Sequence, residues 1–169
     1  MRDFLRSHGD IKLAINWHAY GNNMNIPYNF AESSNTELKS EHPKEYEYFV
    51  RLLASAPHDM KLGNRAATSK FKTNGEVSDY MFHERGILAV SPEIGSSNIK
   101  SMTYYITERN TTLQMLDSHN KWVIMAAKTL LPSLKIDLDH WSQKKDTYDA
   151  QFDITNIGLG QIRNSTIFL

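Results

Sequence analysis

Two polar residues, His18 and Glu93, each follow a short apolar run, and their side chains could do chemistry together. His18 comes directly after Ile11–Trp17, and Glu93 comes shortly after Ile87–Val90. Short apolar runs bounded by turn residues predict buried strands, and ligand sites are often built where such strands end. A neutral imidazole can bind a metal ion, and a carboxylate can take a proton from water. If the two strands share a sheet, the two groups could converge.

Each of these residues also has a structural interpretation. A histidine at the end of an apolar strand is more often a satisfied core or rim residue than a ligand, and Glu93 could be a capping or surface acid. The sequence contains no cysteine, which leaves His, Asp and Glu as the side-chain ligands available to a metal. The choice therefore depends on the residues around His18 and Glu93.

The elements that must position these residues alternate between helix and strand and predict an α/β domain over residues 1–132. Glycine at the end of a helix, as at Gly9 and Gly86, and proline just beyond it, as at Pro132, mark the helix ends. We expect helices at 2–8, 41–56, 76–85 and 108–131, strands at 11–17 and 87–90, and a loop at 61–75.

The pattern changes after residue 132 and predicts the beginning of a second, all-β domain over residues 133–169. Leu134–Leu138 and Phe152–Thr155 alternate in polarity, and further strands are expected around Ile162 and at Thr166–Leu169. Three or four strands are too few to close a sandwich. We therefore expect this sandwich-like accessory domain to be truncated.

The charge balance and the hydropathy of the chain argue against a nucleic-acid partner and against a membrane span. There are 19 Lys and Arg residues against 19 Asp and Glu residues, so no basic surface predicts a nucleic-acid partner. No apolar run is long enough to form a membrane span. Chemistry on a small molecule or a peptide is the remaining expectation.

Two ordered blocks of residues resemble the zinc carboxypeptidase family, the M14 metallocarboxypeptidases. The first is Trp17-His18-Ala19-Tyr20-Gly21-Asn22 followed by Ile26-Pro27-Tyr28; the second is Gly75-x-x-x-Asp79-Tyr80-x-Phe82, then Gly86-Ile87 and Glu93. The resemblance covers roughly residues 1–132 and implies the C-terminal part of a mixed-sheet, phosphorylase/hydrolase-like catalytic domain.

The resemblance implies a role for each matched residue. His18 would be the last of three ligands to one zinc ion, and Glu93 would be the general base and acid. Tyr20 would lie in the substrate cleft, and the substrate would be the C-terminus of a peptide or protein. Phe71 stands where the family has a tyrosine that caps the substrate's terminal carboxylate, so the hydroxyl is missing. Ser78 would fall at the floor of the family's specificity pocket, where a serine would select neither basic nor apolar residues.

The other two zinc ligands are expected upstream of this chain, because the resemblance begins after the family's His-x-x-Glu pair and its carboxylate-binding arginines. We therefore expect an N-terminally truncated fragment that is inactive by itself. His42-Pro43-Lys44-Glu45 has the His-x-x-Glu form, but it follows His18 and opens an amphipathic helix, where Glu45 suits the positive end of the helix dipole.

Two further functions stay open. An amidohydrolase or deacylase could use the same scaffold on a different acyl substrate, and a non-catalytic pseudoenzyme or binding module could keep the cleft without turnover. The family is commonly secreted or lumenal, which is the expected localisation by resemblance alone.

Overall fold

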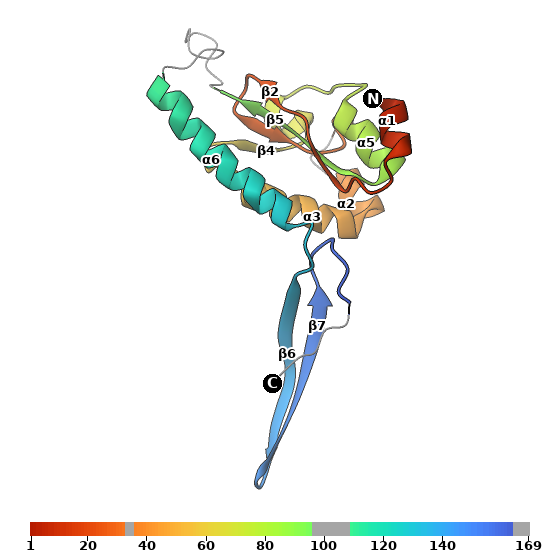
Figure 1. The fold of residues 1–169 in the computed structure, drawn as a ribbon, viewed down its shortest axis with the longest axis vertical. Coiled ribbons are helices and arrows are strands. Elements are labelled where there is room, and N and C mark those ends of the chain that lie inside the picture. Colours follow the sequence, from red (N-terminus) through yellow and green to blue (C-terminus); the bar gives the residue numbers. More distant parts are fainter. Residues whose placement is uncertain (33–35, 96–108, 164–169) are drawn as a thin grey trace. The chain divides into compact units, whose positions relative to one another are not determined.

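The computed structural model describes residues 1–32, 36–95 and 109–163. The chain divides into two compact units, Met1–Ala126 and Ala127–Leu169. The first unit is a mixed sheet with helices, and the second is built on a hairpin (Figure 1). Within the described parts, no helix combines the length and apolar character needed to span a membrane.

The sheet of the first unit is mixed, as expected for the α/β class. Its strands are β1 (Leu13–Ile15), β2 (His18–Ala19), β3 (Asn23–Asn25), β4 (Lys61–Gly63) and β5 (Leu88–Ile94). The order is β1-β5-β3-β4, with β2 also paired to β5. β5 runs parallel to β1 and β2 and antiparallel to β3. Strand β5 is therefore central, and its buried backbone bonds to neighbours on both sides.

One face of the sheet is covered by α1 (Arg2–Ser7) and α5 (Val77–Arg85), which lie side by side in Figure 1. Leu5, Met81, Ile87 and Ala89 form the buried cluster beneath them. Helix α5 ends at Gly86, whose φ of 62° is left-handed, a conformation that costs glycine little. Because the helix ends at this glycine, the chain enters β5 directly after it. The end of the helix therefore sets where Glu93 lies along the strand.

Helices α2 (Thr36–Glu41) and α3 (Pro43–Ala54) also belong to the first unit, which ends within α6 (Arg109–Lys128). Pro43 occupies the first turn of α3, where its missing N–H costs nothing. Trp122 of α6 is 1% exposed and donates from Nε1 to the Leu52 carbonyl at 2.9 Å. Helix α6 runs along the side of the sheet away from α1 and α5 (Figure 1).

Several sequence expectations about the elements were wrong. Residues 61–75 are not all loop, because they contain β4 and the short helix α4 (Arg65–Ser69). The side chain of Asn64 caps α4 by accepting from the Ala67 N–H at 3.1 Å. Strand β3 was missed because its sequence, Asn-Met-Asn, is polar, although all three residues are buried. The expected strand 11–17 is interrupted before His18, and the cap of α1 is His8 rather than Gly9.

The second unit contains one antiparallel hairpin, β6 (Leu134–Lys144) and β7 (Thr147–Asn156). A register shift between Leu138 and His140 lets Trp141 share the face of Leu138, Ile136 and Ile154. Residues 161–163, around Ile162, are not in a strand, and Thr166–Leu169 lies outside the described residues. The all-β character is thus seen only in this hairpin, and the domain boundary after residue 132 stays a prediction.

Candidate active site

A pocket of about 460 Å³ opens where β2, β3 and β5 meet the segment 61–73. Its lining includes Glu93 and two other residues expected at the site, Tyr20 and Phe71. The remaining lining residues are Ala19, Gly21, Asn23, Lys61, Arg65, Thr68, Ser69 and Thr73. The wall is therefore rich in hydrogen-bonding groups and carries both signs of charge.

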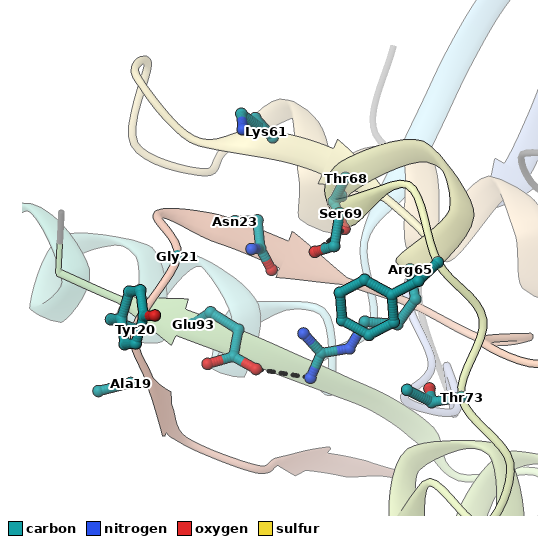
Figure 2. Close-up of a pocket in the computed structure, with 11 residues that line it drawn as sticks. Ala19, Tyr20, Gly21, Asn23, Lys61, Arg65, Thr68, Ser69, Thr73 and Glu93 are labelled. Atoms are coloured by element: carbon teal, nitrogen blue, oxygen red, sulfur yellow. Dashed lines mark hydrogen bonds and ion pairs between the residues drawn. The ribbon is translucent and has the colours of Figure 1, made fainter. Parts of the chain in front are cut away.

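Glu93 lies on β5 at the centre of this pocket and is 7% exposed (Figure 2). It has register partners on both sides, His18 of β2 and Asn23 of β3. Gly21 permits this close arrangement, because a Cβ at Gly21 would lie 2.5 Å from Asn23 Nδ2 and 3.3 Å from Glu93 Cβ. Burial without a counter-charge would be costly for a carboxylate.

Arg65 supplies that counter-charge, and sequence reasoning missed it. Its Nη2 donates to Glu93 Oε1 at 2.5 Å, and its Nε donates to Glu76 Oε1 at 3.1 Å. Arg65 is itself only 9% exposed. The sequence predicts a polar loop at this position, whereas the buried position of Arg65 follows from helix α4. A charged residue next to a capping asparagine was the one available signal, and that signal is weak.

His18 is exposed on β2. Its Nε2 lies 2.7 Å from Asn16 Nδ2, which orients the ring. Although His18 and Glu93 are register partners, His18 does not line the pocket as defined above. The imidazole is accessible to a metal ion approaching from solvent, and its ligand role stays a prediction.

Asn29 makes hydrogen bonds both to helix α5 and to the first residue of helix α4. These bonds satisfy the buried polar groups of Ser78 and Asp79. Its backbone N–H donates to Asp79 Oδ2 at 2.8 Å, and its Nδ2 donates to Asp79 Oδ1 at 2.9 Å and to Ser78 Oγ at 3.3 Å. Its Oδ1 accepts from the Arg65 N–H at 3.0 Å. Asn29 therefore sets the start of α4 and the position of Arg65.

Asp79 has the most perturbed acidity found in the described residues. Burial raises its pKa to about 6, and hydrogen bonds from Asn29 oppose that rise. Ser78 is fully buried beside it and is not among the residues lining the pocket described above. The expected place of Ser78 at the floor of a specificity pocket stays a prediction, whereas Asp79 is a structural acid linking α5 to Asn29.

Phe71 and Tyr20 come from different segments of the chain, one after α4 and one after β2. Phe71 is 53% exposed, and its ring centroid lies 6.0 Å from Arg65 Cζ. Tyr20 follows Ala19 through a cis peptide bond, as Tyr28 follows Pro27. Both aromatic residues are among those that line the pocket.

The described residues do not complete a metal site. They contain no group of three His, Cys, Asp or Glu side chains placed to hold an ion, and Glu93 is engaged by Arg65. The Nε2 atom of His42 instead lies 3.3 Å from the Tyr28 hydroxyl, and the His42 ring packs against Phe82. His42 therefore has a structural setting in the aromatic cluster around Tyr28.

Comparison with known proteins identifies one family. A family model described as zinc carboxypeptidase, Peptidase M14, matches residues 1–122. No curated protein matches the chain. The matched range includes His18, Tyr20, Phe71, Ser78 and Glu93 together with the whole pocket.

Proposed function

Since this chain belongs to the zinc carboxypeptidase family, we propose that it contributes the general base of a metallocarboxypeptidase that removes C-terminal residues from peptides. The single observation that carries the proposal is Glu93, a buried carboxylate that lines a polar pocket between Tyr20 and Arg65. The family consists of hydrolases, and hydrolysis of an amide requires a base near the attacking water.

In the proposed reaction, Glu93 takes a proton from the water that attacks the scissile carbonyl. It then delivers the proton to the leaving amine, so that the carboxylate is regenerated. The second carboxylate oxygen is the one available for this exchange, because the Arg65 bond occupies Oε1. Tyr20 and Phe71 provide the surfaces against which the C-terminal residue would rest.

Zinc is expected from the family, but the described residues alone do not fit a catalytic zinc site. Such a site takes three protein ligands and keeps one position for water, and His18 is one candidate ligand. The proposal therefore assigns the other two ligands to polypeptide upstream of Met1. Sequence upstream of Met1 that carries an in-frame His-x-x-Glu pair would support this assignment, and its absence would contradict it.

The test replaces Glu93 by Gln in the zinc-loaded, full-length protein. We expect kcat on a peptide with a free C-terminus to fall at least about 100-fold, because the amide cannot accept the proton. Glu45→Gln is the matched control, since Glu45 is half-buried on α3 and does not line the pocket, so its change should leave kcat unaltered. Unchanged turnover in Glu93→Gln would sink the assignment.

Substrate panels separate the peptidase from the deacylase. We expect cleavage of peptides with a free C-terminus and little cleavage of the same peptides when amidated. Preferential hydrolysis of N-acyl amino acids would contradict the peptidase proposal. A separate measurement tests His18: His18→Ala should lower the zinc content of the purified protein, and an unchanged zinc content would exclude it as a ligand.

A further inference from the structure

Arg65 joins two buried carboxylates that belong to different elements. Its Nη2 bonds to Glu93 on β5, and its Nε bonds to Glu76, the N-cap residue of α5. All three side chains are nearly buried: counted without the backbone, their exposed fractions are 11%, 9% and 12% for Arg65, Glu93 and Glu76. A rigid guanidinium fork can hold two carboxylates at fixed angles, which a lysine ammonium cannot do.

The same network reaches the segment that carries Phe71. Thr73 Oγ1 donates to Glu76 Oε1 at 3.0 Å, and the Thr73 N–H donates to the Asn29 carbonyl at 3.0 Å. The Arg65 guanidinium also lies 6.0 Å from the Phe71 ring centroid. The carboxylate at the centre of the pocket and the aromatic residue on its wall are therefore held by one cation.

We propose that Arg65 is a positioning residue that orients Glu93 for proton transfer, and this rests on the function proposed above. The bond to Oε1 fixes the carboxylate plane, and Figure 2 shows the other oxygen pointing away from Arg65 toward the side of the pocket where Tyr20 lies. Glu76 accepts a hydrogen bond from Nε of the same guanidinium. The Glu93 carboxylate therefore cannot rotate without breaking a buried ion pair.

The contacts favour this role over direct binding of a substrate carboxylate. Two donors of the guanidinium, Nε and Nη2, already bond to protein carboxylates, and a substrate anion that used either donor would have to displace one of these carboxylates. Because displacement would leave a buried carboxylate without its partner, it would be unfavourable. Arg65 therefore acts through Glu93, and its loss should change turnover more than binding.

The kinetic test compares Arg65→Lys with wild type in the zinc-loaded, full-length protein. We expect kcat to fall about 10- to 100-fold through misorientation of the base, while KM changes less than about threefold. Arg51→Lys is the control, because Arg51 lies over the Tyr48 ring on α3 and away from the pocket. A rise in KM with unchanged kcat would overturn the proposal and make Arg65 a substrate-binding residue.

A double substitution tests whether Arg65 works through Glu93. If it does, adding Arg65→Lys to Glu93→Gln should cause no further loss of the residual kcat. Multiplicative losses would mean that the two residues act separately and would overturn the proposal. Activity that survives Glu93→Gln alone would instead refute the proposed function, so the two failures can be told apart.

A spectroscopic measurement does not depend on activity or on a substitution at Arg65. In NMR spectra of this chain, the Arg65 Nε–H resonance should be sharp and protected from solvent exchange. Glu93→Gln and Glu76→Gln should each shift and broaden it, whereas Glu45→Gln should leave it unchanged. An Arg65 resonance that is insensitive to Glu93→Gln would overturn the proposal.

Discussion

His18 and Glu93 are register partners on the neighbouring parallel strands β2 and β5, with Asn23 opposite Glu93 on its other side. The backbone therefore brings the two residues of the matched blocks to one place in the sheet. The side chains differ in setting, because His18 is exposed and Glu93 is buried against Arg65. The sheet register gives the proximity, and the surrounding segments give each residue its environment.

Gly21→Ala should destabilise the protein and disturb the pocket. The new Cβ would lie 2.5 Å from Asn23 Nδ2, and the Asn23 side chain is held by a 2.6 Å bond from Asn25. We expect a loss of about 1–3 kcal/mol in the free energy of unfolding, measured by urea denaturation. Gly9→Ala is the control, because nothing lies within 4 Å of its added Cβ. Equal effects of the two substitutions would contradict this packing.

Asp79 should make the protein less stable as the pH rises from about 4 to about 7. Its folded-state pKa is about 6 against an ordinary value of 3.8, so the folded protein binds the proton more tightly. The stabilisation is fully present below the lower value and is lost as the pH passes the higher one. It amounts to at most about 3 kcal/mol.

The measurement is the free energy of unfolding as a function of pH for wild type and Asp79→Asn. The substitution should flatten the decline between about pH 4 and pH 7, whatever it does to stability at a single pH. Far-ultraviolet circular dichroism at neutral pH checks that the variant is folded. Identical slopes for the two proteins would show that Asp79 does not retain its proton in the folded state.

Phe71→Tyr should improve binding of peptides with a free C-terminus in the full-length enzyme. A phenol can donate a hydrogen bond to a carboxylate, and a phenyl ring cannot. We expect KM to fall by about tenfold, the value of one hydrogen bond to a charged group, with no gain on amidated peptides. Phe4→Tyr, at an exposed position of α1, should change neither. An equal gain on both kinds of peptide would contradict carboxylate capping.

Trp122→Phe should lower stability, because Trp122 is buried and donates to the Leu52 carbonyl. Loss of that bond and of the ring volume should cost about 1–3 kcal/mol in a denaturation experiment. Trp141→Phe is the matched control, since Trp141 is 60% exposed on the hairpin. It should change stability by less than about 0.5 kcal/mol.

Local sequence signals determined much of the framework. Gly86 ended α5 and Pro43 began α3, as predicted, because the conformational limits of glycine and proline act within a few residues. The apolar run Ile87–Val90 predicted a buried strand, and most of it lies in β5. Apolar character is also a signal that acts within a few residues. The two ordered blocks also identified the family, since they preserve both residue type and spacing.

Only the tertiary structure decided what surrounds Glu93. Arg65 is 28 residues away in sequence and was expected in a loop, yet it is the partner that neutralises this carboxylate. The polar strand β3 could not be predicted either, because it is defined by its pairing with β4 and β5 and not by a pattern of apolar residues in its own sequence. Apolar periodicity and turn residues reveal local conformation, whereas a buried ion pair depends on where separate elements meet.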